Sequence, residues 1–491
     1  MKKYIYSFCA VAIASLALSS CKKDYLNTAP TDQYNKDVVF STTANAYGVL
    51  NGIYRLMYSQ YSNQNEGGES SVMIDADLLG EDLVFPTTGN NWFVDSYQWL
   101  MHRTVNSSQD YFVYRYYYRL IGNTNQILEN IDAATGPDAD KKAIKGEALA
   151  IRAFCHFKLV QLYGKRYVAG GNNTQLGVPL VATTSVEPQP RATVEDVYKQ
   201  INADLDAAIT NLTGASARTT KSHINLNVAQ GLKARVALTQ QDYATAAAYA
   251  ALARTGLSLM SNADYMAGFN NLSNTEWMWG ITQISDQTTY FYSFFAYMSV
   301  NFNSTNIRSN PKCINSALYE RISATDVRKK LWDPTGTDAT FPVPPNGSRF
   351  PYMNRKFLAN SAANSYGDLT FMRAGEMYLI EAESNARQGK DVLAQDALYT
   401  LAKNRDASYV KSTNTGAALI DEIMTQRRVE LWGEGFRFFD LKRLDLALNR
   451  NGANHVTTVA KVLEIPKGDP QWEWLIPQNE ITSNPKIVQN P

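Results

Sequence analysis

Hydrophobic residues recur every three or four positions through much of the first half of the chain, the spacing of helices that bury one face. In residues 193–212 this face consists of Val194, Val197, Ile201, Leu205, Ala208 and Leu212. Thr193, with Asp196 three residues later, forms a capping box at its start. Residues 118–131 and 146–164 show the same spacing, and Gly164 stands where a helix would end. The pattern therefore predicts that helices dominate this half.

Two later segments, residues 231–253 and 379–401, each resemble a helix, a short turn and a second helix. Small residues occupy corresponding places in the two, such as Ala234 with Ala382 and Ala246 with Ala394. Small side chains let antiparallel helices approach closely, which is the packing of tetratricopeptide repeats. The alternative is that these are two unrelated helical hairpins.

Between these hairpins, residues 262–369 change in character. They are rich in Asn, Ser, Thr, Pro, Gly and aromatic residues and show no helical period. Residues 276–281 alternate like a short strand, and we expect Trp277 and Trp279 to face the core. Long irregular segments inside a compact chain are usually functional, so this region is a candidate ligand face.

The N-terminus has the three parts of a targeting signal. Lys2 and Lys3 precede an apolar run at 4–18, which is short for a transmembrane helix. Leu18, Ser19 and Ser20 before Cys21 then resemble a bacterial lipobox, in which cleavage precedes a lipid-modified cysteine. We therefore expect residues 1–20 to be a lipoprotein signal peptide and Cys21 to carry the lipid anchor. The alternative is an ordinary secretory signal, in which Cys21 is incidental.

The composition of the chain excludes some classes of function. Without Lys2 and Lys3 the formal charge of +1 becomes −1, so nothing electrostatic favours nucleic-acid binding. Cys155 and Cys313 are the other cysteines after Cys21, too few for a disulfide framework. The chain has 29 Tyr, 19 Phe and 8 Trp, an aromatic content that suits a surface meeting ligands or partners.

Five segments in order carry a resemblance to a known family. They are "CKKDYLNTAPTDQ" at 21–33, "GEALAIRAFCHFKLVQLYG" at 146–164, "FMRAGEMYLIEAESNARQG" at 371–389, "RRVELWGEGFRFFDLKRLD" at 427–445 and "LIPQNEITSNPKIVQNP" at 475–491. The fourth is the most specific, with Arg427, Arg428, Glu430, Glu434, Arg437, Asp440 and Arg443. On these segments the chain resembles the SusD/RagB family of outer-membrane nutrient-binding lipoproteins.

The resemblance implies a mostly α fold: tetratricopeptide-like helix pairs form a bundle beside a loop-rich irregular subregion. We expect an N-terminal helical region at 21–261, the loop-rich aromatic subregion at 262–369 and a C-terminal SusD/RagB region at 370–491. Residues 21–491 together would form one compact unit.

The resemblance also implies a function. Such proteins are lipid-anchored at the outer membrane and face the cell exterior. They act as the hinged lid of a SusC-like TonB-dependent barrel, to which they deliver captured oligosaccharides or, in some members, peptides. They are not enzymes. One departure concerns export, because Lys22, Lys23 and only Asp24 follow Cys21, where surface-exposed members often have acidic residues.

The charged signature at 427–443 invites a catalytic interpretation, but its three- and four-residue spacings favour ion pairs on a helix. A glycosidase needs two carboxylates facing each other across a cleft, and no pair is singled out. His102, His156, His223 and His455 are scattered, and His156 lies in an apolar helix as a core residue. No metal-binding, phosphate-binding or nucleophile motif is present, so we expect no catalytic residues, metal or cofactor.

Sugar binding requires aromatic rings that stack on pyranose faces and polar groups that pair with hydroxyls. Asn90, Asn91 and Trp92 offer this in an early loop, and Tyr290 and Tyr292 offer it in the loop-rich subregion. Trp99 is a further candidate. For each aromatic the alternative is packing of the loop onto the bundle. Three other functions stay open: a peptide-capturing lid, a repeat scaffold without a small ligand, and a hydrolase.

Overall fold

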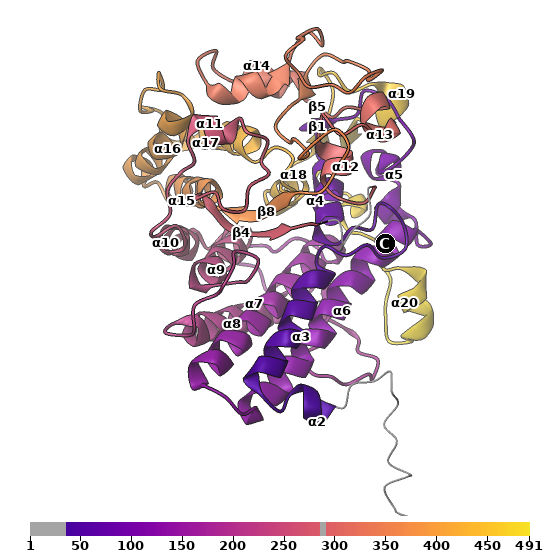
Figure 1. Cartoon of the computed structure of the whole chain (residues 1–491), viewed down its shortest axis with the longest axis vertical. Helices are drawn as coiled ribbons and strands as arrows, with labels where there is room; N and C mark the ends of the chain where they lie inside the picture. The colour runs from indigo at the N-terminus through magenta and orange to yellow at the C-terminus, as the bar shows by residue number, and fades with distance from the viewer. Residues whose placement is uncertain (1–35, 285–290) are drawn as a thin grey trace, which may run out of the picture.

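The computed structural model describes residues 36–284 and 291–491, so Cys21 and Tyr290 lie outside the described residues. The prediction of a mostly α fold is confirmed. The long helices lie side by side in the lower half of Figure 1. They are α3 (Thr43–Leu56), α6 (Ser108–Asn130), α7 (Asp138–Tyr163) and α8 (Val194–Leu212), with the short α2 (Lys36–Val39) preceding them.

The predicted ends of two of these helices are correct. Thr193 Oγ1 accepts a hydrogen bond from the Asp196 N–H at the start of α8. Helix α7 ends at Gly164, but this glycine has an extended backbone with φ of −97° rather than the left-handed one of a typical C-cap. A glycine is needed there for space, since a Cβ at this position would lie 2.8 Å from the Val160 carbonyl oxygen.

Both predicted hairpins are present, and they stack on each other. The first is α9 (Leu226–Gln240) with α10 (Tyr243–Ala253), and the second is α15 (Ala374–Arg387) with α16 (Asp391–Arg405). Helix α10 packs against α15, and α17 (Gly416–Glu430) packs against α15 in turn. Buried alanines line these contacts, which allows the close approach of the helices.

The loop-rich subregion is held by short antiparallel strands. A four-stranded sheet has the order β1 (Leu83–Val84), β5 (Cys313–Ile314), β7 (Met353–Asn354), β6 (Trp332–Asp333). Strand β4 (Trp277–Thr282) pairs with β8 (Asp368–Arg373), and both Trp277 and Trp279 are buried, as predicted. Short helices decorate the subregion: α11 (Asn262–Tyr265), α12 (Phe295–Met298), α13 (Thr305–Ser309) and α14 (Ser316–Glu320).

The remaining elements include the buried helices α4 (Glu69–Leu78) and α18 (Arg437–Arg443) as well as short peripheral strands and helices. The others are α5 (Val94–Tyr97), β2 (Leu176–Pro179), β3 (Arg191–Thr193), β9 (Leu448–Asn449), α19 (Thr457–Ala460), β10 (Glu464–Ile465) and α20 (Gln478–Ser483). The 3₁₀ turns are Met101–Arg103, Ile131–Ala133, Val327–Leu331 and Pro470–Trp472.

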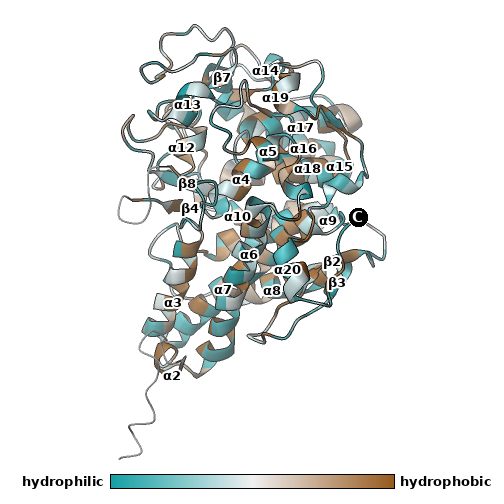
Figure 2. Ribbon diagram, turned by 90° about the vertical axis from the view of Figure 1, so that its right-hand side faces the viewer, coloured by the Kyte–Doolittle hydropathy of each residue, from teal (hydrophilic) through white to brown (hydrophobic). Residues whose placement is uncertain are grey.

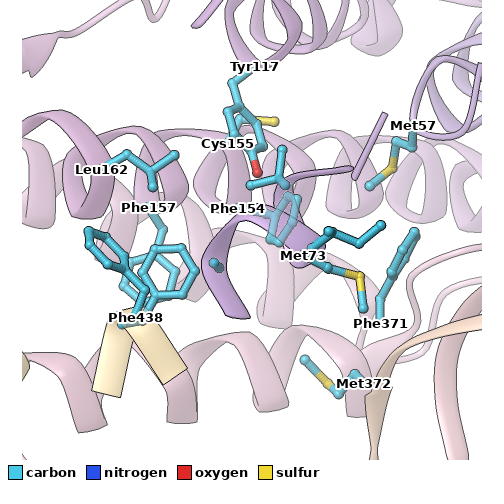
Figure 3. Packing of buried hydrophobic residues seen from close by; sticks show 14 of the residues in the cluster. Met57, Met73, Tyr117, Phe154, Cys155, Phe157, Leu162, Phe371, Met372 and Phe438 are labelled. Atoms are coloured by element: carbon cyan, nitrogen blue, oxygen red, sulfur yellow. The ribbon is translucent and has the colours of Figure 1, made fainter. Parts of the chain in front are cut away.

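A large hydrophobic core runs through the helical half and into the loop-rich subregion. In Figure 3, Phe154 of α7, Met73 of α4, Phe371 of β8 and Phe438 of α18 meet within one cluster. Both α3 and α7 carry hydrophilic as well as hydrophobic residues (Figure 2). Helix α3 buries one face, whereas α7 is buried on nearly all sides from Gly146 to Tyr163. Within the described residues, no helix combines the length and apolarity that crossing a membrane needs.

The cysteines and two histidines take part in this core. Cys155 and Cys313 are buried and free. His102 and His156 are fully buried, and burial lowers the pKa of each imidazole to about 3. Both rings are therefore neutral at physiological pH, which fits a structural role.

Candidate functional site

The early loop that carries Trp92 lies against the middle of the loop-rich subregion. Strand β1 pairs with β5, and the loop that follows β1 is tied to α13. Thr87 Oγ1 donates to the Ser309 carbonyl oxygen at 2.7 Å, and Asn90 Nδ2 donates to Thr305 Oγ1 at 3.5 Å. These bonds bring together two segments that are more than 200 residues apart in the sequence.

A glycine makes this close contact possible. Gly89 has a left-handed backbone with φ of +51°, and a Cβ there would lie 2.8 Å from the side chain of Asn310. Any other residue would both strain the backbone and push the loop away from the end of α13.

Trp92 stands between two left-handed residues, Asn91 with φ of 68° and Phe93 with φ of 62°. Phe93 is buried and packs edge-on against Tyr297, with ring centroids 4.9 Å apart. With Phe93 fixed in the core, Trp92 remains half-buried while Asn90 and Asn91 are exposed. The loop thus offers one ring and two amides to solvent.

We call the surface formed by Asn90, Asn91, Trp92 and Thr305 the Trp92 face. It combines part of an aromatic ring, the rest of which packs against the core, with amide and hydroxyl groups that can pair with ligand hydroxyls. Arg308 lies three residues after Thr305 on α13 and is half-buried, and its Nη1 donates to Asn303 Oδ1 at 2.7 Å.

The structure places the other candidate aromatics differently. Trp99 is 1% exposed and packs edge-on against Trp472, with ring centroids 5.0 Å apart. Contrary to the prediction, its ring is therefore not available to a ligand. Tyr292 is 4% exposed and likewise offers no ring to solvent. Its neighbour Phe291 is 47% exposed. The sequence did not mark Phe291 as a candidate, because no polar residue stands directly beside it.

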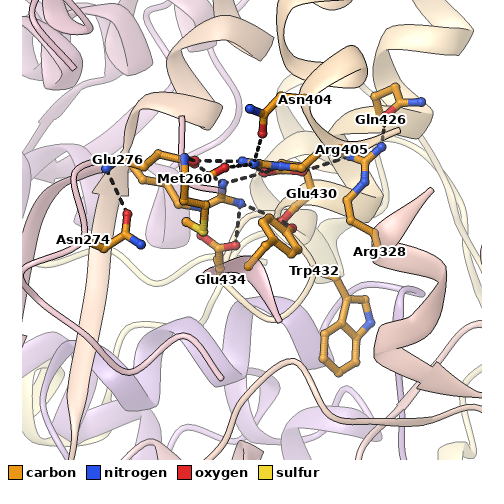
Figure 4. Close-up of polar contacts among 12 residues, drawn as sticks. Met260, Asn274, Glu276, Arg328, Asn404, Arg405, Gln426, Glu430, Trp432 and Glu434 are labelled. Carbon is orange, nitrogen blue, oxygen red and sulfur yellow. Dashed lines mark hydrogen bonds and ion pairs between the residues drawn. The ribbon is translucent and has the colours of Figure 1, made fainter. Parts of the chain in front are cut away.

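A buried ion network joins the loop-rich subregion to the C-terminal helices (Figure 4). At its centre is the carboxylate of Glu430, the last residue of α17. Three guanidinium groups donate to it: Arg328 at 2.9 Å, Arg373 at 2.6 Å and Arg405 at 2.9 Å. The carboxylate of Glu276 also forms ion pairs with the guanidinium groups of Arg373 and Arg405.

The network keeps its acids ionised. Burial alone would raise the pKa of Glu430, but Arg405, Arg373 and Arg328 outweigh it and hold that pKa well below its ordinary value. Burial would also raise the pKa of Glu434, which Arg373 and Lys356 lower in the same way. Carboxylates paired like this serve the structure, and neither is available as a general acid.

The sequence predicted ion pairs at three- and four-residue spacing within the signature, and one of them forms, Arg443 with Asp440 at 2.8 Å. Arg427 also binds Asp440, at 2.7 Å, but this pair joins α17 to α18 across 13 residues. Most other signature charges find distant partners instead. Arg428 binds Asp82 and Arg437 binds Glu81, the two residues directly before β1. The signature therefore fixes the segment that leads into the Trp92 loop.

The histidines and acids of the described part of the chain do not gather into a metal site. Among residues 36–284 and 291–491, no group of three or more His, Cys, Asp or Glu side chains is placed to hold a metal ion. His223, for example, bonds instead to Glu147 and Asn51, at 2.9 Å each.

Sequence comparison assigns the chain to a family. Residues 24–238 match the family described as "Starch-binding associating with outer membrane", and residues 237–491 match the one described as "SusD family". The chain belongs to the SusD/RagB family, as the resemblance predicted. A SusD-like protein of Formosa agariphila is 22% identical over 446 residues, covering 79% of this chain and 80% of the relative.

Solved structures show the same fold. A SusD-like carbohydrate-binding protein of Bacteroides vulgatus superposes with a TM-score of 0.81 at 24% identity, covering 91% of this chain and 98% of its own. A SusD superfamily protein of Bacteroides thetaiotaomicron gives 0.78 at 24% identity, covering 92% and 100%. A laminarin-binding SusD-like protein gives 0.70 at 19% identity, covering 92% and 99%.

Proposed function

We propose that this protein captures oligosaccharides on the Trp92 face and delivers them, as a lid, to a SusC-like TonB-dependent barrel. The observation that carries the proposal is the partly exposed ring of Trp92 next to the exposed amides of Asn90 and Asn91, in a loop that is hydrogen-bonded to α13. A lipid on Cys21 would hold the protein at the outer membrane, facing the cell exterior.

The chemistry of the face suits a sugar. The flat C–H face of a pyranose stacks on an indole ring and excludes water from it. The hydroxyls at the edge of the sugar then need partners, because a buried unpaired polar group costs about 1–3 kcal/mol. The amides of Asn90 and Asn91 and the hydroxyl of Thr305 supply donors and acceptors beside Trp92. The platform is fixed before binding, so little ordering cost opposes affinity.

The relatives support a saccharide ligand. One structural neighbour carries the description laminarin-binding and another carbohydrate-binding, and one matched family is described as starch-binding. Peptide capture is the second candidate, favoured by the exposed apolar ring of Phe291, which a side chain could contact. A scaffold without a small ligand is the third. The signature carboxylates are consumed in buried ion pairs, so binding rather than hydrolysis is proposed.

The test is affinity electrophoresis of the purified soluble chain in gels containing a panel of polysaccharides, followed by calorimetry with the matching oligosaccharide. Trp92→Ala should weaken binding about tenfold or more, which corresponds to ~1.4 kcal/mol. Tyr399→Ala is the matched control, since Tyr399 is a half-buried aromatic on α16, outside the Trp92 face.

Three results would count against parts of the proposal. Unchanged affinity in Trp92→Ala would remove the site assignment but keep the function. A protein that ignores every polysaccharide and binds a peptide pool would establish the second candidate. Release of soluble products from a polysaccharide by the purified protein would overturn the assignment as a binding protein.

A further inference from the structure

The helical half of the molecule contains a groove that is separate from the Trp92 face. It runs between α6, the segment 179–189 and α20, and its volume is about 520 Å³. In Figure 2 α6 and α20 lie next to each other on the side that faces the viewer. We call it the α6–α20 groove, and it shares no residue with the Trp92 face.

One wall of the groove is a row of tyrosines. Tyr111, Tyr114 and Tyr118 follow each other at three- and four-residue spacing on α6, so they point to the same side of the helix. The rings of Tyr114 and Tyr118 are 4.7 Å apart. Tyr111 and Tyr118 are half-buried, so part of each ring lies on the wall of the groove, where the face of a sugar can stack.

A buried hydroxyl in this wall has room for a further partner. Tyr114 is 3% exposed, and its hydroxyl interacts with that of Tyr118, which itself donates to the Pro179 carbonyl oxygen at 2.9 Å. A ligand hydroxyl in the groove would give the Tyr114 hydroxyl a second partner.

The charged groups of the groove balance each other. Arg115 and Arg119 come from α6, Glu480 from α20 and Glu187 from the segment between them. Within the part of the chain that the structure describes, none of these four makes an ion pair. Both guanidinium groups lie over the ring of Tyr61, and Glu480 accepts a hydrogen bond from Asn484 Nδ2 at 3.0 Å. Two cations and two anions leave no net charge, so the groove does not select a charged ligand, and the remaining donors and acceptors can pair with sugar hydroxyls.

The walls of the groove are tied together before any ligand arrives. Asn484 Nδ2 donates to the Gln189 carbonyl oxygen at 2.9 Å, joining α20 to the segment 179–189. Asn125 Nδ2 donates to the carbonyl oxygens of Val181 and Thr183, joining that segment to α6. A preformed groove of this volume, with an aromatic wall and converging polar groups, has the features of a ligand site.

We propose that the α6–α20 groove is a second saccharide-binding site, which takes a neutral oligosaccharide. Its sugar faces stack on Tyr111 and Tyr118, one hydroxyl pairs with Tyr114, and the arginines and glutamates bind the ring edges. The choice of ligand class rests on the proposed function of the protein, while the location rests on the groove alone. A long glycan would then be held at two places.

The experiment uses the purified soluble chain, titrated in a calorimeter with neutral hexasaccharides of glucose, mannose and xylose. The Trp92→Ala protein should keep weaker binding of at least one of them. Adding Tyr111→Ala and Arg119→Ala to it should abolish that residual binding. Tyr114→Phe, which removes only the hydroxyl, should weaken it about three- to tenfold. Tyr399→Ala in the same background is the matched control, and circular dichroism checks folding.

The outcomes separate the groove from the function. Complete loss of hexasaccharide binding in Trp92→Ala overturns the groove and leaves the proposed function standing. Residual binding that Tyr111→Ala and Arg119→Ala leave unchanged also overturns the groove. Residual binding of a peptide pool or of charged oligosaccharides alone overturns the ligand class. Absence of any saccharide binding in the unmodified protein overturns the proposed function itself.

Discussion

At the scale of single residues, Glu430 is the most consequential side chain outside the Trp92 face. It is fully buried, and its carboxylate accepts hydrogen bonds from three arginines. These arginines belong to the loop-rich subregion, to β8 and to α16. Desolvating so many charges is costly, and only complete pairing compensates for it. Removing the shared anion therefore leaves several buried cations short of a partner.

Glu430→Gln should lower the free energy of unfolding by about 3–5 kcal/mol, the range for breaking a buried ion pair. Urea denaturation followed by tryptophan fluorescence measures the change. Lys411→Ala is the control, because the Lys411–Asp396 pair is partly exposed on both sides and such pairs contribute about 0–1 kcal/mol. Equal and small effects of the two substitutions would show that the network does not hold the subregion in place.

The signature alone could not reveal this network. The spacing of Arg427, Glu430 and Glu434 indicated ion pairs among these residues, but Arg427 pairs with Asp440 instead, and the two glutamates pair with cations outside the signature. The main partners, Arg328, Arg373 and Arg405, lie 102, 57 and 25 residues away from Glu430. Short-range helical spacing carries no information on contacts of that range, which depend on how the hairpins and the sheet close.

At the scale of elements, α4 shows where hydrophobic patterning fails. All of its residues from Glu69 to Leu78 are buried, so it has no polar face and no helical period to detect. The amphipathic α8 was predictable because it keeps one side for solvent. The two stacked hairpins were predictable from their matching small residues, although α9 and α15 are buried on nearly all sides. The same limit applies to the aromatic candidates: Trp92 and Trp99 sit in similar sequence, yet only the folded loop decides which ring is buried.

Helix α4 also makes stability depend on pH. Burial raises the pKa of Asp75 to about 7, although Ser96 and Gln109 donate to its carboxylate at 2.7 and 2.8 Å. In the unfolded chain an aspartate loses its proton near pH ~4. Between about pH 4 and 7 the folded state therefore binds more protons than the unfolded one, and Asp75 makes stability fall as pH rises.

Asp75→Asn should remove this contribution. The free energy of unfolding of the variant minus that of the unmodified protein should therefore be larger at pH 8 than at pH 5. The new amide finds an acceptor in Gln109, whose Oε1 has no hydrogen-bond partner. Urea midpoints at the two pH values measure the effect, and Asp95→Asn, which removes an exposed carboxyl on α5, is the control. A pH dependence identical to that of the unmodified protein would contradict the argument. Asp77, whose pKa burial also raises to about 7, keeps part of the slope.

At the scale of the whole molecule, two halves of different design share one core. Stacked helices form a rigid base, while short strands and loops carry the Trp92 face at the opposite end (Figure 1). The sequence predicted this division, because a helical period is present in one part and absent in the other. It also placed the candidate site in the early loop and the middle subregion, but not the contact between them, which depends on β1 pairing with β5.

The attachment of the whole molecule to a membrane is the last prediction. If a lipid on Cys21 is the anchor, Cys21→Ser should move the protein from the membrane fraction to the soluble fraction, since several acyl chains are what hold such a protein firmly. A barrel that co-purifies with the detergent-extracted native protein should then be recovered in much smaller amount, because anchoring in one membrane raises the effective concentration of the two partners. Immunoblots of both fractions, and pull-down with an affinity tag at the C-terminus, measure the two effects separately.

Release without loss of the barrel would mean that the lid is held by protein contacts alone, and retention at the membrane would mean that Cys21 is not the anchor. Glycan binding by the released protein should match that of the soluble chain, because Cys21 precedes the folded residues that form the Trp92 face.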